Sequence, residues 1–200
     1  MNRNPSINSI AVFSGSNFGS HEDYIEQAKK LGQAIAERGQ TMVYGGTTKG
    51  LMGVVADAAL DAGGEVIGVI TERLQARGHL HPKLTGHEVV SGMRERKARM
   101  AELSDGFIAL PGGLGTFEEL FEVLTWAQLG FHGKPIGLLD VTGYYAPLAQ
   151  MLQNGVAEGF MKPENAELLL REHDIDTLLA AMARYRAPVR EQRIQNEKQL

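Results

Sequence analysis

Stretches of apolar and β-branched residues alternate along this chain with segments of helical periodicity. The apolar runs, which we interpret as strands, cover residues 10–14, 41–44, 66–70, 87–90, 107–110, 136–140 and 167–170. The helical patterns cover residues 24–38, 50–61, 93–103, 117–129, 144–157 and 175–185. Because the strands are apolar throughout, we expect both of their faces to be buried, as in parallel sheets. The alternation therefore predicts an α/β fold in which a parallel sheet carries helices on both faces.

The length and composition bound the class of protein. The 200 residues suffice for one domain, which we place at residues 1–186, followed by a polar tail at residues 187–200. The chain has no cysteine, which excludes disulfides, cysteine-ligated metals and thiol catalysis and fits a cytoplasmic location. A net charge of −4 gives no basic field for nucleic acid, and no apolar run reaches membrane-spanning length. We therefore expect neither nucleic acid nor a membrane as a partner.

Three glycine-bearing turns follow predicted strands, at residues 14–16, 45–47 and 111–116. The carboxyl ends of parallel strands meet at one edge of a sheet, so these turns can converge on a single crevice. None of them matches the dinucleotide pattern GxGxxG or the phosphate-loop pattern GxxxxGK[ST]. Dinucleotide binding and ATP hydrolysis are disfavoured on that ground.

The segment Pro111 to Glu119, with the sequence PGGLGTFEE, joins a predicted strand to a predicted helix. Its three glycines allow the backbone to approach a ligand closely, and the free N–H groups at the start of a helix favour an anion. A tight turn with a helix cap is the alternative, although a plain turn needs only one glycine. Glu118 and Glu119 add carboxylates near the helix start, and we expect only one of them to face the reacting atoms. The segment suggests chemistry on a phosphorylated sugar or nucleotide.

A basic segment follows another predicted strand and contains Arg94, Arg96, Lys97 and Arg99. A solvated helix face is the ordinary interpretation of such a run. Its place at the same sheet edge as the glycine turns favours a second interpretation, in which an Arg-Lys pair complements a phosphate. The histidines lack metal-ligand spacing, so we expect no metal site and interpret them as loop or surface residues; they are His21, His79, His81, His87, His132 and His173.

These motifs resemble those of a known family. PGGLGTFEE is similar to the PGGxGTxxE motif of the LOG ("Lonely Guy") family of cytokinin riboside 5′-monophosphate phosphoribohydrolases, whose members are often labelled lysine decarboxylases. The segment from Met93 to Lys97 is similar to the second motif of the family, Met-His-x-Arg-Lys. The resemblance extends from about residue 10 to residue 170 and includes residues 12–16, 43–46, 50–53, 66–70 and 125–130.

The resemblance implies a Rossmann-like, doubly wound fold and a homodimer with active sites near the interface. It implies hydrolysis of the N-glycosidic bond of an N6-modified adenosine 5′-monophosphate, without metal or cofactor, to a free base and ribose 5-phosphate. Lysine decarboxylation would need pyridoxal phosphate on a Schiff-base lysine, and nothing in the sequence supports such a site.

The resemblance also assigns residues. It places the catalytic pair at Arg96 and Glu119. The residues that we expect to contact the substrate are Ser14, Gly15, Gly45, Gly46, Met93, Lys97, Gly112, Gly113, Leu114, Gly115, Thr116, Phe117, Glu118 and Thr125.

Three positions depart from the family pattern. Arg94 stands where a His is usual, Thr47 interrupts a commoner triple glycine, and Gly78 replaces a Glu found upstream of a His. We expect these changes to affect the preferred base more than the reaction. Two alternatives stay open: a general AMP or purine monophosphate nucleosidase, and a non-catalytic protein that binds a nucleotide or molybdenum cofactor.

Overall fold

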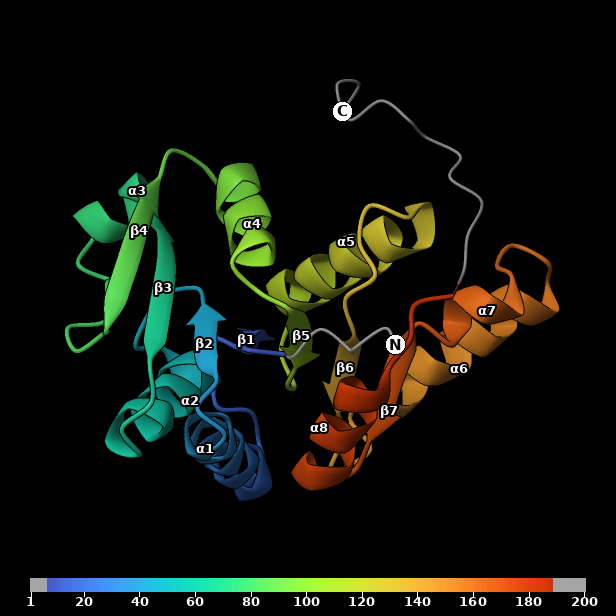
Figure 1. Ribbon diagram of the computed structural model, residues 1–200, viewed down its shortest axis with the longest axis horizontal. Helices are drawn as coiled ribbons and strands as arrows, with labels where there is room; N and C mark the ends of the chain where they lie inside the picture. Colours follow the sequence, from blue (N-terminus) through green and yellow to red (C-terminus); the bar gives the residue numbers. More distant parts are fainter. Residues whose placement is uncertain (1–6, 189–200) are drawn as a thin grey trace, which may run out of the picture.

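A computed structural model of the chain describes residues 7–188. Its strands form one seven-stranded parallel sheet in the order β4-β3-β2-β1-β5-β6-β7 (Figure 1). The strands are β1 (Ser9–Phe13), β2 (Thr41–Tyr44), β3 (Val66–Thr71), β4 (Gly86–Val90), β5 (Gly106–Ala109), β6 (Ile136–Leu139) and β7 (Leu169–Glu172). The predicted doubly wound α/β fold is confirmed, and the last strand lies two residues later than its apolar pattern indicated.

Eight helices accompany the sheet in the described residues. They are α1 (Glu22–Glu37), α2 (Gly50–Asp61), α3 (Glu72–Ala76), α4 (Met93–Glu102), α5 (Leu114–Leu129), α6 (Ala146–Ala157), α7 (Pro163–Ala166) and α8 (Ile175–Arg184). The sequence patterns missed α3 and α7, because helices of five and four residues are too short to show a periodicity. The Thr71 hydroxyl accepts a hydrogen bond from the Leu74 N–H and caps α3.

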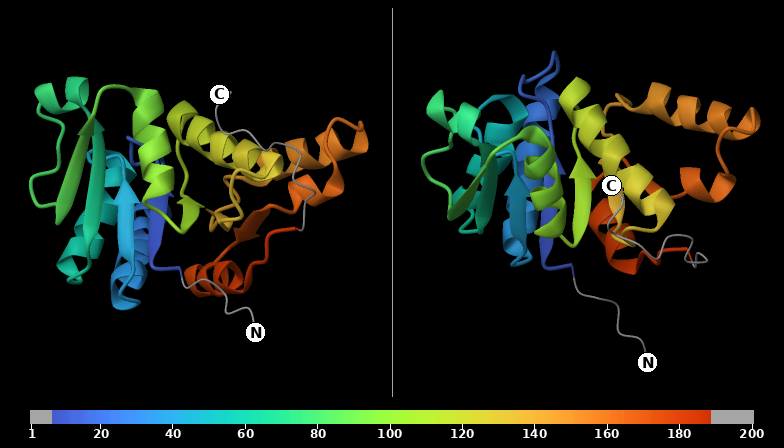
Figure 2. Two further views of the ribbon diagram at one scale, coloured as in Figure 1. Left: turned by 45° about the horizontal axis from the view of Figure 1, so that its top comes forward. Right: turned by 90° about the horizontal axis from the view of Figure 1, so that it is seen from above.

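Helices cover both faces of the sheet in two separate layers (Figures 1 and 2). In β1, Ile10 and Val12 join a core with α1, α2 and α8, whereas Ala11 and Phe13 join a core with α4 and α5. All four side chains are at most 4% exposed. Burial of apolar surface on both faces is the main stabilising contribution, and it explains why inner strands such as β1 are continuously apolar.

The chain changes direction across the sheet at β1. From β1 it winds outward through β2, β3 and β4, and it then returns to place β5 on the other side of β1. The loops that follow β1 and β5 therefore leave the carboxyl ends of these two strands in different directions. Open α/β sheets bind ligands at this point. The Gly15 N–H donates to the Pro111 carbonyl oxygen at 3.0 Å and joins these two loops.

Between residues 7 and 188, no helix has both the length and the apolar character needed to cross a membrane. Of the predicted tail, residues 189–200 lie outside the described residues, and the predicted domain end at residue 186 stays a prediction.

Candidate active site

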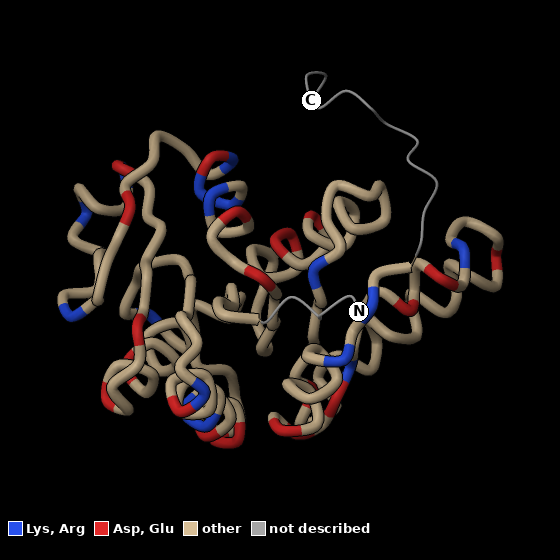
Figure 3. The backbone as a smooth tube through the Cα atoms, viewed as in Figure 1, with Lys and Arg blue, Asp and Glu red and all other residues tan. Residues whose placement is uncertain are grey.

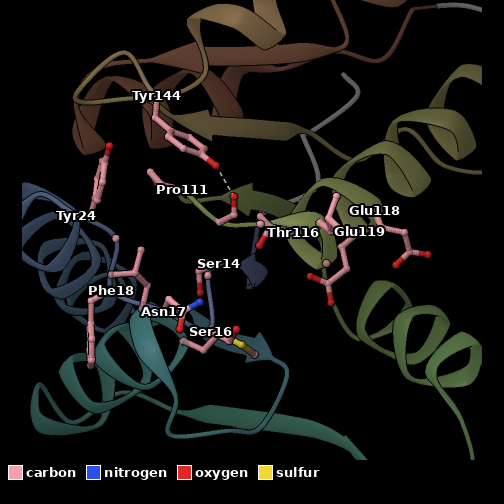
Figure 4. Close-up of a pocket in the computed structure, with 18 of the residues that line it drawn as sticks. Ser14, Ser16, Asn17, Phe18, Tyr24, Pro111, Thr116, Glu118, Glu119 and Tyr144 are labelled. Carbon is pink, nitrogen blue, oxygen red and sulfur yellow. Dashed lines mark hydrogen bonds between the residues drawn. The ribbon is translucent and has the colours of Figure 1, made fainter.

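A cavity of about 500 Å³ lies at the carboxyl ends of β1 and β5 (Figure 4). Eleven of the sixteen predicted site residues line it: Ser14, Gly15, Met93, Arg96, Gly112, Gly113, Leu114, Gly115, Thr116, Glu118 and Glu119. The structure places the other predicted contacts outside this lining, and they are Gly45, Gly46, Lys97, Phe117 and Thr125.

The glycine-rich turn is shorter than its sequence indicated, because α5 begins at Leu114 instead of Phe117. Gly115 and Thr116 therefore belong to the first turn of the helix, and their backbone N–H groups have no partner within it. A Cβ atom on Gly112 would lie 2.1 Å from the Thr116 hydroxyl oxygen, whereas one on Gly113 or Gly115 would meet nothing within 4 Å. Gly112 thus permits close packing inside the turn, while Gly113 and Gly115 leave open space beside the helix N-terminus.

Two tyrosines after β6 hold this turn in place. The Tyr144 hydroxyl donates to the Gly112 carbonyl oxygen at 2.5 Å (Figure 4), and the buried Tyr145 hydroxyl donates to the Leu110 carbonyl oxygen at 2.6 Å. The Ser14 hydroxyl lines the cavity, is buried, and has no hydrogen-bond partner among the described residues. A polar ligand can satisfy it.

The central charged pair of the cavity comes from α4 and α5. Arg96 Nη1 lies 3.6 Å from Glu119 Oε1, and the two side chains are 6% and 13% exposed. Arg96 Nε also donates to the carbonyl oxygen of Val69 in β3 at 2.8 Å. The pair is therefore fixed by contacts to the sheet and largely removed from water.

Burial changes the acidity of both members of the pair. It raises the pKa of the Glu119 carboxyl to about 7, although the Arg96 guanidinium acts in the opposite direction. Burial also lowers the pKa of Arg96, and the Glu119 carboxylate opposes that change. A carboxyl group with a pKa near neutrality can both accept and release a proton, as general acid-base chemistry needs.

The two adjacent glutamates have separate surroundings, as Figure 4 shows. Both lie in the second turn of α5, which corrects our expectation that they lie at the helix start. The Glu118 carboxylate forms an ion pair with Lys97, and Lys97 Nζ also lies 3.0 Å from Glu122 Oε1. Lys97 therefore joins α4 to α5, both of which carry several charged residues (Figure 3). Its predicted contact with the substrate stays a prediction.

Other predicted contacts have structural surroundings of their own. The Phe117 ring stacks on Tyr144 with the centroids 6.4 Å apart. The exposed Thr125 donates its hydroxyl hydrogen bond to the Phe121 carbonyl oxygen one turn earlier in α5. Gly46 has φ +74°, which favours glycine, and Gly45 lies next to the Arg96 guanidinium. The roles of these residues toward a substrate are untested.

Sequence reasoning missed an aromatic part of the lining, formed by Phe18, Tyr24 and Tyr144. In Figure 4 these side chains lie across the cavity from Glu118 and Glu119. The Tyr24 and Tyr144 rings meet edge to face at 6.1 Å, although the two residues are far apart in the sequence. The position of Tyr144 just after a strand end was the one available signal.

His81 lies in a loop, as expected of the histidines, but unlike a surface residue it is buried. This residue is 3% exposed, and its Nε2 lies 3.1 Å from Asp57 Oδ1. Asp57 was missed as a partner because it lies in α2, far from His81 in sequence. Within the described part of the chain, no cluster of three or more His, Asp or Glu side chains could hold a metal ion.

The residues that depart from the family pattern lie outside the cavity lining. Thr47 forms an isolated antiparallel bridge with Leu80, and Gly78 lies just after α3 with φ +73°. A glutamate at position 78 would adopt that backbone conformation only with strain. Arg94 is exposed on α4.

Comparisons with known proteins assign the family. Residues 52–182 match a family described as "possible lysine decarboxylase". Over 179 residues the chain is 46% identical to the cytokinin riboside 5′-monophosphate phosphoribohydrolase of Rhodococcoides fascians, covering 89% of this chain and 90% of that protein. It is 45% identical to an Arabidopsis thaliana enzyme of the same name, covering 91% of this chain and 84% of that enzyme. The chain belongs to the LOG family.

Solved structures agree with this family's fold. The molybdenum cofactor carrier protein of Chlamydomonas reinhardtii superposes with a TM-score of 0.66 at 22% identity, covering 88% of this chain and 96% of the carrier. This likeness concerns the fold alone.

The cavity of this LOG-family chain does not fit the decarboxylase description. Pyridoxal phosphate chemistry needs a lysine that forms a Schiff base. None of the described residues that line the cavity is a lysine, and the nearby Lys97 is held by Glu118 and Glu122.

Proposed function

We propose that this LOG-family chain hydrolyses the N-glycosidic bond of N6-modified adenosine 5′-monophosphate to the free base and ribose 5-phosphate. The buried pair of Arg96 and Glu119, placed in one cavity with the N-terminus of α5, is the observation that carries the proposal. The names of relatives that are 45–46% identical support the same reaction.

The 5′-phosphate is assigned to the N-terminus of α5. The backbone N–H groups of Gly115 and Thr116 and the helix dipole favour an anion there. The Ser14 hydroxyl, which is buried without a partner among the described residues, supplies a further donor on the opposite loop. Binding energy from the phosphate positions the sugar for reaction, so substrates without the phosphate should react poorly.

The chemistry takes place at C1′ of the ribose. As the bond between C1′ and the base nitrogen breaks, its electron pair leaves with the base and positive charge develops on the sugar. The Glu119 carboxylate stabilises this charge and accepts a proton from the water that attacks C1′. The departing base takes up one proton from solvent, and Glu119 returns to solvent the proton that it accepted from the attacking water, so no net proton is gained or lost. Arg96 fixes the orientation of Glu119 and of the substrate. The sum is substrate plus water giving base plus ribose 5-phosphate.

A panel of substrates tests the proposal. Purified protein is incubated with AMP, an N6-alkylated AMP, inosine monophosphate and the matching nucleosides, and release of ribose or ribose 5-phosphate is measured. We expect the N6-alkylated monophosphate to react fastest, and each nucleoside to react about 100-fold or more slowly than its monophosphate.

The other outcomes separate the alternatives. Equal turnover of all purine monophosphates would indicate a general nucleosidase with a wide base pocket. Binding of AMP without any release of ribose 5-phosphate would indicate a carrier and would contradict hydrolysis. Equal turnover of adenosine and AMP would contradict the assigned phosphate site.

We also propose that the protein is a cytoplasmic homodimer. Its exposed apolar side chains support a second copy as partner, because Met151 in α6 is 54% exposed and Phe160 is 92% exposed. None of the described residues of α6 is buried in the single chain. Light scattering during gel filtration should give twice the mass of one chain, and a monomer mass would contradict the proposal.

A further inference from the structure

The Arg96 side chain crosses the carboxyl ends of β3 and β2 before it reaches Glu119. Its Nε hydrogen bond to the Val69 carbonyl oxygen fixes one side of the guanidinium, and the ion pair with Glu119 fixes another. The side chain is almost fully buried, so its position depends on the space left by its neighbours.

Gly45 provides that space directly after β2. A Cβ atom on Gly45 would lie 1.8 Å from Arg96 Nη2 and 2.4 Å from Met52 Cε. The backbone of Gly45 does not need glycine, because the left-handed φ belongs to Gly46 and not to Gly45. The two adjacent glycines are therefore needed for different reasons. Gly46 adopts a positive φ that favours glycine, and Gly45 leaves room for the Arg96 guanidinium.

We propose that Gly45 is a positioning residue: because it has no side chain, it leaves the space in which the Arg96 guanidinium lies against Glu119. The consequence for catalysis rests on the proposed function. Any side chain at position 45 displaces the guanidinium from Val69 or from Glu119. Gly45 itself lies outside the cavity lining, so it acts through Arg96 and not as a substrate contact.

The atoms that a new Cβ would strike are the ends of two flexible side chains, those of Arg96 and Met52. They can move aside at small cost, whereas struck backbone atoms could not. We therefore expect Gly45→Ala to fold and to lose the alignment of Arg96. Its thermal unfolding midpoint should fall by less than about 4 °C.

The test compares Gly45→Ala with Gly86→Ala, whose new Cβ would lie 4.0 Å from Ile67 Cγ1 and meet nothing closer. For Gly45→Ala we expect the kcat of ribose 5-phosphate release to fall of the order of 100-fold, since displacing a catalytic group by about 1 Å has an effect of that size. Gly86→Ala should keep the wild-type kcat. Wild-type kcat in Gly45→Ala would overturn the proposal.

A second readout does not depend on activity. The charged groups that act on Glu119 are Arg96 and Lys97 from α4 and Glu118 and Glu122 from its own helix, and Arg96 has the largest effect among them. Carbon-13 NMR of the Glu119 carboxyl should therefore show a higher titration midpoint in Gly45→Ala than in the wild type. If the wild type does not cleave AMP, the proposed function fails, while this titration still tests whether Gly45 positions Arg96. An unchanged midpoint in Gly45→Ala would overturn the role proposed for Gly45.

A double variant covers the case in which Gly45→Ala is unstable. In an Arg96→Ala background there is no guanidinium to displace, so Gly45→Ala should destabilise the fold less than it does in the wild type. An equal loss of stability in both backgrounds would show that the clash lies elsewhere and would overturn the proposal.

Discussion

Tyr44 and Tyr145 are both at most 1% exposed, but their hydroxyl groups have different surroundings. The Tyr145 hydroxyl donates to the Leu110 carbonyl oxygen at the end of β5, directly before the glycine turn. The Tyr44 hydroxyl is buried without a hydrogen-bond partner among the described residues. Burial raises the pKa of both phenols, so both remain neutral at physiological pH. One hydroxyl stabilises the fold, and the other has a desolvation cost without compensation.

Removing the two hydroxyls should therefore have different effects on stability. We expect Tyr145→Phe to lower the free energy of unfolding by about 1–3 kcal/mol, because it leaves the buried Leu110 carbonyl oxygen without its donor. Tyr44→Phe should be neutral or stabilising. Urea unfolding of the two variants and the wild type measures both changes, and a larger loss for Tyr44→Phe would contradict this account.

At the scale of elements, α4 supplies Arg96 and α5 supplies Glu119, so the site depends on how these two helices sit against each other. Lys97 joins them by its contacts with Glu118 and Glu122, and its side chain is only 12% exposed. Partly buried ion pairs are costly to break because the remaining charges lose their partner. Lys97 thereby fixes α4 relative to α5 beside the pair formed by Arg96 and Glu119.

Lys97→Met keeps most of the side-chain volume and removes the charge. We expect it to lower the free energy of unfolding by about 1–3 kcal/mol. The matched control is Lys30→Met in α1, because Lys30 pairs with Glu26 while both side chains are more than half exposed. This surface pair should contribute less than about 0.5 kcal/mol. Equal effects of the two substitutions in urea unfolding would refute the role assigned to Lys97.

Element by element, the sequence was informative where its physical signal was continuous. Buried parallel strands need unbroken apolar runs, so the sheet and its long helices could be predicted from residues such as those of β1 and β3. The start of α5 could not be predicted from the sequence, because Gly115 and Thr116 are poor helix formers that the fold nevertheless places in the first turn. The partners of Lys97 and His81 depend on tertiary contacts between distant segments, which no local pattern contains.

At the scale of the whole molecule, the sheet order determines where the site lies. The reversal at β1 opens a crevice in which residues from several separate segments of the chain meet, and the Glu119 carboxyl is buried there with a raised pKa. A carboxyl group whose pKa is higher in the folded than in the unfolded state binds its proton more tightly when folded. Its contribution to stability is present below the unfolded pKa, near 4.5, and is lost as the pH rises through about 7.

The difference in stability between Glu119→Gln and the wild type should therefore change with pH. We expect the variant to gain of the order of 2 kcal/mol relative to the wild type between pH 5 and pH 8, since the amide does not ionise. Urea unfolding of both proteins at the two pH values measures this difference. A constant difference would show that the Glu119 pKa is not raised in the folded protein.

The central claim is that Glu119 performs the chemistry on a substrate held by its phosphate. The most direct test is the rate of ribose 5-phosphate release from saturating AMP by Glu119→Gln, together with the Kd of AMP for the same variant. We predict that kcat falls about 100-fold or more while Kd changes only a few-fold, because the carboxylate acts on charge that develops in the transition state. Wild-type kcat in Glu119→Gln would contradict the account.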